Sequence, residues 1–398
     1  MNTGAAVSSP HSPLRSAADT VLLAPDKFKG SATAAQVAKA LARGISATAP
    51  EVRLIHCPIA DGGDGTVDAA LTAGYTEHPA TVTGPTGKKR AARWAQGSDG
   101  TAVVELAETV GLQALPGGDL AGRTASTRGL GELILAAVTA GARSVMVGLG
   151  GSASTDLGAG LLQGLGARLL DADGVGIGPG LDGLARLVTA DLDPAREALD
   201  GVQLIIASDV TSPLLGPEGA AGVFGPQKGL AATEIDEAEA ILERAAAVLD
   251  PSGDLRDRPG AGAAGGAGFA LHLLGALPRS GADAVLELAG FDQHLDSAHL
   301  VITGEGALDE QTLQGKGPAE VARRAAARSL PVLAVAGAVR LDPSRLREAR
   351  IERAWDLLSR AGGSAQAMAS TEELLEDVGR EIGAHLSEAR LGQGREPS

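Results

Sequence analysis

The sequence contains a single cysteine, Cys57, among its 398 residues. No disulfide can therefore form within the chain, and a zinc site built from cysteines is excluded. Aromatic residues are also scarce, at 2%, although hydrophobic residues make up 44% of the chain. A core of useful size must therefore be built from Ala, Leu, Val and Ile.

Positive charge is in short supply, because 34 Lys and Arg stand against 49 Asp and Glu, a formal net charge of -15. Such a chain repels phosphate backbones and anionic lipids, so we expect no nucleic-acid partner and no membrane partner. The segment before Thr20 lacks the apolar region of a signal peptide, and no apolar run is long enough to span a membrane. These absences predict a cytoplasmic protein.

Glycine, by contrast, is abundant, with 56 residues spread among apolar runs. This pattern indicates many tight turns between strands and helices. The length suits two domains of about 100–200 residues each. Short apolar strands alternate with helical segments from Val21 onward, which predicts an α/β fold with a parallel sheet. The segment Thr81–Glu105 changes character and predicts antiparallel strands and a domain crossing.

Several predicted strands end in an acidic residue beside glycines. In open α/β sheets, ligands bind outside the carboxyl ends of the strands, so these carboxylates should face the ligand. Like charges repel at close range, so either cations share the site or some of the acids cap helices and turns instead. As a set beside lysines, they favour a site for Mg²⁺ and phosphate. The acids are Asp26, Asp61, Asp64, Asp209, Glu305 and Asp309.

Basic residues follow two of the predicted strands. Lys27 and Lys29 come directly after the first strand, and Gly30 and Ser31 open the next helix. Ammonium groups, a hydroxyl and helix N–H groups at one strand end make a good anion site, the alternative being a solvated turn. Lys316 occupies a similar place before a later predicted helix.

A glycine-rich segment, GLGGSASTD at residues 148–156, follows a predicted strand and opens a helix. Gly150 and Gly151 let the backbone approach a ligand, so that N–H groups can donate to phosphate, and Ser152 and Ser154 add hydroxyls. The alternative is a turn with a capping side chain. The G-x-G-x-x-G string at residues 260–265 follows no strand, and no G-x-x-x-x-G-K-[ST] motif is present. Neither a dinucleotide fingerprint nor a Walker A loop is therefore predicted.

Taken together, these motifs make the sequence resemble the bacterial glycerate kinase family whose members open with APDxFKGS. The matching stretches run in the family's order from Val21 to about Leu386. They are APDKFKGS (24–31), PIADGGDGT (58–66), GPTG (84–87), ASTRGLGELI (125–134), GLGGSASTDLGAG (148–160), ASDVTSPLLGPEGAAGVFGPQKG (207–229), PGAGAAGG (259–266) and TGEGALDEQTLQGKGP (303–318).

The resemblance implies an α/β protein of two domains with the active site in the cleft between them. A discontinuous flavodoxin-like parallel-sheet domain would comprise residues 20–83 and 290–388, and an inserted α/β domain with mixed strands would comprise residues 84–289. Residues 1–19 and 389–398 are expected to be disordered tails. We expect either a monomer or a homodimer.

The activity implied is phosphorylation of D-glycerate by ATP with Mg²⁺, in glyoxylate or related metabolism. The 2-phosphate is the favoured product and the 3-phosphate the alternative. A kinase for another small hydroxy acid or sugar, and a ligand-binding module without turnover, remain the other hypotheses. Thr155 and Ser212 stand where the family usually has Asn, and Ala307 where Arg is common. The loss of an arginine removes a bidentate anion clamp.

The resulting hypothesis gives each candidate residue a role. The triphosphate would bind Gly150, Gly151, Ser152 and Ser154, assisted by Lys316. Catalytic roles fall to Lys29 and to Asp209 or Asp309 as the base. The metal ligands would be Asp61, Asp64 and Asp209, and the residues that contact substrate would be Lys27, Lys29, Asp61, Asp64, Arg128 and Glu305.

Overall fold

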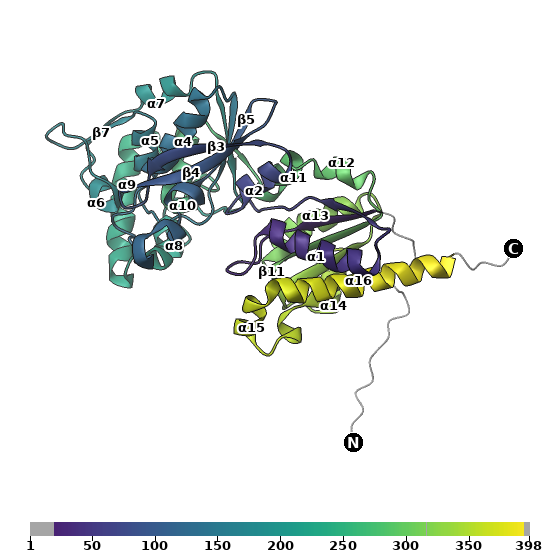
Figure 1. Cartoon of the computed structure of the whole chain (residues 1–398). Coiled ribbons are helices and arrows are strands. Elements are labelled where there is room, and N and C mark those ends of the chain that lie inside the picture. The colour runs from purple at the N-terminus through teal and green to yellow at the C-terminus, as the bar shows by residue number, and fades with distance from the viewer. Residues whose placement is uncertain (1–19, 316, 394–398) are drawn as a thin grey trace. The chain divides into compact units, whose positions relative to one another are not determined.

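The computed structural model describes residues 20–315 and 317–393 of the chain (Figure 1). The predicted tail at residues 1–19 and Lys316 lie outside the described residues. The predicted C-terminal tail was placed too early, because helix α16 (Thr371–Gln393) continues through residues 389–393. Ala389, Arg390 and Leu391 are good helix formers, so the helix does not stop at Glu388.

The chain divides into two compact units. Unit 1 consists of the residues up to Ile59 together with those from Gly290 onward, and unit 2 is residues 60–289. The first boundary therefore lies at Ile59 and not at Thr83. The reason is strand pairing, because β3 (Thr76–Thr83) pairs along its whole length with β4 (Lys89–Gln96) in unit 2.

Unit 1 contains a five-stranded sheet that is parallel throughout, in the order β13-β12-β11-β1-β2. With the strands numbered within the unit, this is the 2-1-3-4-5 order of flavodoxin-like folds. The predicted flavodoxin-like parallel-sheet domain is thereby confirmed. The strands are β1 (Thr20–Pro25), β2 (Arg53–His56), β11 (Leu300–Leu308), β12 (Val332–Val339) and β13 (Arg353–Asp356).

Helices α1 (Ala34–Thr48) and α16 lie side by side although they come from opposite ends of the chain (Figure 1). Thr33 and Gln36 form a capping box that begins α1. The two helices pack so closely that a Cβ at Gly44 would lie 2.1 Å from the carbonyl oxygen of Glu376. The other helices of unit 1 are α12 (Phe291–Leu295), α13 (Gly317–Ala326), α14 (Pro343–Glu348) and α15 (Ser364–Ala369).

The core of unit 1 is aliphatic, as the composition predicts. Side chains of α1 and α16 meet the buried residues of the parallel strands in one cluster. Its main members are Val21, Leu23, Val37, Leu41, Ile45, Leu300, Ile302, Leu333, Val335, Leu375, Val378 and Ile382.

Unit 2 contains a six-stranded sheet in the order β10-β9-β6-β5-β4-β3. Strands β3, β4 and β5 are antiparallel neighbours, whereas β5, β6, β9 and β10 are parallel. The inserted α/β domain with mixed strands is thereby confirmed. The remaining bounds are β5 (Thr101–Glu105), β6 (Ser144–Gly148), β9 (Gln203–Ala207), β10 (Leu277–Arg279) and the hairpin β7 (Arg168–Leu170) and β8 (Thr189–Asp191).

The helices of unit 2 enclose an aliphatic core of their own. They are α2 (Thr66–Thr72), α3 (Leu106–Val110), α4 (Arg128–Thr139), α5 (Ala159–Gly164), α6 (Gly180–Leu184), α7 (Asp193–Ala198), α8 (Ala220–Lys228), α9 (Ile235–Leu249), α10 (Ala263–Leu273) and α11 (Gly281–Leu288). Among the described helices of the whole chain, none combines the length and the apolar character that crossing a membrane requires.

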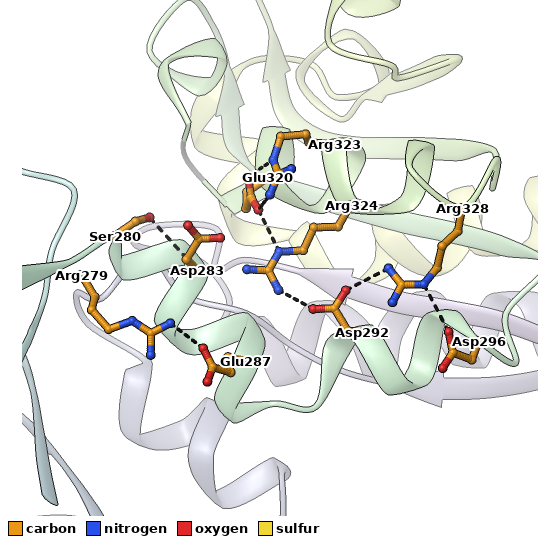
Figure 2. A network of polar contacts seen from close by, with 10 residues as sticks. All are labelled: Arg279, Ser280, Asp283, Glu287, Asp292, Asp296, Glu320, Arg323, Arg324 and Arg328. Carbon is orange, nitrogen blue, oxygen red and sulfur yellow. Dashed lines mark hydrogen bonds and ion pairs between the residues drawn. The ribbon is translucent and has the colours of Figure 1, made fainter.

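A ladder of ion pairs joins α12 to α13 within unit 1 (Figure 2). Arg324 donates to Glu320 at 2.8 Å and to Asp292 at 2.6 Å. Arg328 donates to Asp292 at 2.9 Å and to Asp296 at 3.2 Å. The side chains of Arg324 and Glu320 are only 14% and 11% exposed, whereas that of Arg328 is 36% exposed. The Arg324 end of the ladder should therefore contribute more to stability.

We expect Arg324→Ala to lower the free energy of unfolding by about 2 kcal/mol, because it removes a charged partner from the nearly buried Glu320. Arg328→Ala, the matched control in the turn after the same helix, should lower it by about 0.5 kcal/mol or less. Urea unfolding followed by circular dichroism measures both. A larger loss for Arg328→Ala than for Arg324→Ala would contradict the ranking.

Candidate functional site

Four segments of unit 2 pack backbone against backbone at the carboxyl ends of its parallel strands: two loops, the end of β9 and the start of α11. We call residues 61–65 the acidic loop and residues 148–156 the glycine loop. A Cβ at Gly150 would lie 2.4 Å from the Cα of Gly63, and one at Gly62 would lie 2.4 Å from the carbonyl oxygen of Ala207. A Cβ at Gly281 would lie 2.0 Å from the carbonyl oxygen of Asp61. No residue larger than glycine fits these contacts without a shift of the backbone.

The glycine loop presents open N–H groups. It is held by the N–H of Leu112, which donates to the Gly151 carbonyl at 2.8 Å, and by the N–H of Ala153, which donates to Val110. Among the hydrogen bonds within the described part of the chain, none is donated by the N–H groups of Gly150, Gly151 or Ser152. Gly151 has a φ of 74°. Successive open N–H groups around a left-handed residue form a concave anion site.

The serine hydroxyls of this loop point inward. Ser152 is 6% exposed and Ser154 is fully buried. The Ser152 hydroxyl accepts from the N–H of Ser154 at 3.2 Å and lies 3.2 Å from the carbonyl oxygen of Ala264 and from the Ser154 hydroxyl. The loop therefore offers its backbone N–H groups to an anion, whereas both predicted hydroxyl ligands are engaged within the protein.

Lys228, the last residue of α8, lies beneath the glycine loop and was not among the predicted site residues. Its ammonium donates to the carbonyl oxygen of Ser154 at 2.6 Å and lies 3.4 Å from the Ser152 hydroxyl, and the residue is 2% exposed. Burial lowers the pKa of Lys228 to about 7, although the Asp156 carboxylate opposes this shift. A possible signal in the sequence was the scarcity of lysine, because only seven of the 34 basic residues are lysines.

Asp156 ends the glycine loop and is completely buried. Its carboxylate accepts from the N–H groups of Thr127, Gly158 and Gly160 at 2.8 to 3.2 Å, and also from the Thr127 hydroxyl. Burial raises the pKa of Asp156 and these hydrogen bonds lower it. The carboxylate thus ties the start of α4 to the start of α5 and fixes the far end of the loop.

Glu105, at the end of β5, was also missed by sequence reasoning. It is 2% exposed, and its carboxylate accepts from the N–H groups of Gly65 and Val67 at 3.1 Å. These are among the first N–H groups of α2, so Glu105 holds the acidic loop in place. Burial raises the pKa of Glu105 to about 8, and the carboxylates of Asp64 and Glu108 add to the rise.

Asp209 follows β9 and caps α11. Its Oδ1 accepts from the Ser280 hydroxyl and from the N–H of Gly281, both at 2.9 Å. Burial raises the pKa of Asp209, these two bonds lower it, and the Asp61 carboxylate raises it further. The structure therefore brings Asp61 and Asp209 together, whereas Asp64 acts on Glu105.

The donor chemistry here suits a magnesium ion only in part. Within residues 20–315 and 317–393, no group of three or more His, Cys, Asp or Glu is arranged to hold a metal. A cage formed by Asp61, Asp64 and Asp209 together is therefore not seen. Mg²⁺ in phosphoryl-transfer sites usually takes one or two carboxylates and completes its shell with phosphate and water. Asp61 beside Asp209 and the glycine loop fits that smaller requirement.

Arg128, at the start of α4, is already engaged. It donates to Glu132 at 3.2 Å. It lines a cavity of about 210 Å³ together with Gly84 and Ser126, and no other predicted site residue lines that cavity. Arg128 is thus not grouped with the other predicted site residues.

The remaining described candidates belong to unit 1. Lys29 lines a cavity of about 280 Å³ at the carboxyl ends of β1, β11 and β12, together with Phe28, Gly306 and Arg340. In flavodoxin-like sheets the ligand crevice opens between the first and third strands, which here are β1 and β11. Lys27 lies 3.8 Å from Asp26.

Glu305 lies within β11, near its carboxyl end, and Asp309 directly follows the strand. Glu305 accepts from the Thr312 hydroxyl at 2.6 Å. Asp309 accepts from the N–H of Gln311 at 2.9 Å, and its own N–H donates to Thr312 at 3.0 Å. Both acids thus shape the turn that precedes Lys316.

The comparisons with known proteins agree with one another. A family model described as "Glycerate kinase family" matches residues 21–387. A Bacillus subtilis protein named glycerate kinase is 39% identical over 376 residues, which cover 93% of this chain and 98% of the relative. An Escherichia coli protein named glycerate 2-kinase is 39% identical over 373 residues, with coverages of 92% and 98%. A solved structure described as glycerate kinase 2 from Salmonella typhimurium LT2 has a TM-score of 0.81 and 34% identity, covering 94% of this chain and 100% of that one.

The raised pKa of Glu105 predicts a stability that depends on pH. The pKa is about 8 in the folded chain against an ordinary value of 4.5. Between these pH values the unfolded chain releases the proton and the folded chain keeps it, so stability falls as pH rises. We expect the melting temperature of the wild type to fall by a few degrees relative to Glu105→Gln from about pH 5 to about pH 8.

Differential scanning fluorimetry across this range provides the measurement. Glu77→Gln, which replaces an exposed glutamate of β3, is the control and should track the wild type. If the melting temperature of the wild type stayed constant or rose relative to that of Glu105→Gln as the pH rises, the raised pKa of Glu105 would be refuted.

Proposed function

The chain belongs to the glycerate kinase family, and we propose that it transfers the γ-phosphoryl group of ATP to a hydroxyl of D-glycerate. The observation that supports this most directly is the glycine loop, whose N–H groups at Gly150, Gly151 and Ser152 are open at the end of β6. Phosphoryl transfer needs positioning and charge stabilisation more than covalent chemistry. Backbone N–H donors that are already in place supply both the positioning and the charge stabilisation.

In this proposal the glycine loop binds the triphosphate. Its N–H groups are directional donors, and phosphate oxygens are strong acceptors that form charge-assisted hydrogen bonds. Ser152 contributes through its backbone N–H, because its hydroxyl is buried, whereas Ser154 is proposed to shape the loop, since its own N–H already donates to the Ser152 hydroxyl. Lys316 is proposed to add a point charge on the transferred phosphoryl group.

Magnesium would be held by Asp61, with Asp64 and Asp209 as the other candidate ligands. When bound, the ion would neutralise negative charge on the phosphate oxygens. Asp61 is suited to this role because it belongs to the acidic loop, whose backbone packs directly on the glycine loop at Gly63 and Gly150.

Asp209 is proposed to accept the proton of the attacking glycerate hydroxyl. Its pKa is raised by burial and by Asp61, which brings it closer to the value that favours proton transfer near neutral pH. The bonds from Ser280 and Gly281 to Oδ1 fix the carboxylate in orientation. Asp309 is the alternative base.

For the glycerate carboxylate we propose Lys29 as the main partner, with Lys27 and Arg128 as alternatives. Lys29 and Arg340 line one cavity that no Asp or Glu lines. Lys27 lies close to Asp26, and Arg128 is paired with Glu132, so both are partly compensated already. Glu305 is proposed to accept a hydrogen bond from a glycerate hydroxyl.

Incubation of the purified protein with ATP, MgCl₂ and D-glycerate, followed by phosphorus NMR, tests the reaction. We expect ADP and 2-phosphoglycerate, since the Escherichia coli relative is named a glycerate 2-kinase. The chemical shift separates this product from the 3-phosphate. Parallel reactions with hydroxypyruvate and with sugars test another kinase activity. Turnover with none of these acceptors would favour a binding module and refute the proposal.

The base is tested with a matched pair of isosteric variants. Asp209→Asn keeps an oxygen that can accept from Ser280 and Gly281, so the cap of α11 should survive. We expect kcat to fall at least about 100-fold, because the amide cannot take the proton. The kcat of Asp309→Asn should fall far less. The reverse pattern would transfer the role to Asp309.

A further inference from the structure

Lys228 has no part in the reaction as described, yet it is among the most buried side chains of the molecule. A lysine is almost never fully buried without a partner, because its ammonium loses hydration. The partners here are the Ser154 carbonyl oxygen at 2.6 Å and the Ser152 hydroxyl at 3.4 Å. Both belong to the glycine loop.

The start of α10 closes over the same contact. A Cβ at Gly265 would lie 2.1 Å from the Ser154 carbonyl oxygen and 2.8 Å from the Lys228 ammonium. Ala264, Gly265 and Gly266 all have positive φ angles, a backbone that a non-glycine residue such as Ala264 rarely adopts. Three segments therefore converge on one buried ammonium: the glycine loop, the end of α8 and the start of α10.

The direction of the Ser154 carbonyl has a consequence for the anion site. A carbonyl oxygen that faced the ligand would repel phosphate. Lys228 draws this oxygen inward, and the Ser152 hydroxyl is held on the same inner side. The N–H groups of Gly150, Gly151 and Ser152 remain open.

The charge of Lys228 acts in the same direction. Asp156 is the carboxylate that opposes the loss of its proton, but the oxygens of Asp156 already accept from Thr127, Gly158 and Gly160. The ammonium therefore has no close ion-pair partner among the described residues. In its protonated form Lys228 places a positive charge behind the loop, which favours an anion in front of it, because the interior screens the interaction less than water does.

We propose that Lys228 is the positioning residue of the phosphate site, which holds the Ser154 carbonyl and the Ser152 hydroxyl inward so that the glycine loop presents N–H groups to the nucleotide. The inference rests on the proposed function, in which this loop binds ATP. It assigns to Lys228 an effect on nucleotide affinity without contact with the nucleotide.

Lys228→Met tests it, because Met keeps the length and apolar stem of the side chain and removes the ammonium. We expect the Kd for ADP, measured by isothermal titration calorimetry, to rise at least about tenfold. The KM for ATP should rise by a similar factor. The KM for glycerate should stay within about twofold. This split separates positioning of the phosphate loop from a general loss of structure, which would affect both substrates.

Leu242→Ala is the stability control. Leu242 is fully buried in α9, within the core of unit 2, and its side chain has no polar group that could bond to the glycine loop. The Leu242→Ala variant should lower the melting temperature, as Lys228→Met does, and should leave the Kd for ADP within about twofold of the wild-type value. If Lys228→Met does not accumulate as folded protein, Ser152→Ala removes one of the two acceptors of the ammonium, and the Kd should rise about threefold.

An unchanged Kd for ADP in folded Lys228→Met would overturn the inference, as would an unchanged Kd in Ser152→Ala when only that variant folds. The wild type separates this failure from that of the proposed function. If the wild type phosphorylates glycerate and the variants bind ADP normally, only the inference fails. If the wild type neither binds ADP nor turns over, both fail.

Discussion

The candidate site depends on contacts in which one backbone meets another with no side chain between them. Gly63 meets Gly150, Gly62 meets the carbonyl of Ala207, and Gly281 meets the carbonyl of Asp61. These contacts place the acidic loop against the ends of β6 and β9. A single Cβ at any of them would separate segments that must lie together for carboxylates and open N–H groups to face one ligand. The high glycine content thus has a specific use here, beyond the supply of turns.

An acidic protein that binds a polyanion must compensate charge locally, and the proposed site would do so chiefly with backbone N–H groups. The buried carboxylates of Glu105 and Asp156 are each satisfied by N–H donors and not by an arginine. Many of the arginines meanwhile form ion pairs elsewhere, as Arg324 does with Asp292. Lys228 is the exception, since its charge is buried where only a carbonyl and a hydroxyl receive it. N–H groups are donors that cannot be neutralised by protonation changes, which makes them a stable basis for an anion site.

Much of this arrangement was predictable from the sequence, because the signals are local. Alternating strands and helices indicated the fold class, and the antiparallel character of residues 81–105 indicated the mixed sheet. The glycine loop was recognisable from its composition, but the direction of its hydroxyls was not. The boundary at Ile59 could not be read either, since residues 60–83 are placed in unit 2 by contacts remote in sequence, such as the pairing of β3 with β4 and the bonds of Gly65 and Val67 to Glu105. The burial of Glu105 and Lys228 likewise depends on segments remote in sequence, and neither residue was predicted.

The cavity of unit 1 carries cations although one motif position there has lost its arginine. Ala307 stands where the family commonly has Arg, yet it lines the same cavity as Lys29 and Arg340. Ala307 pairs with Ala338 across β11 and β12, and Arg340 follows two residues beyond Ala338. A cation missing from one strand is therefore present near the end of its neighbour. Because parallel strands end at the same edge of a sheet, the guanidinium of Arg340, which directly follows β12, lines the same cavity as Ala307 of β11.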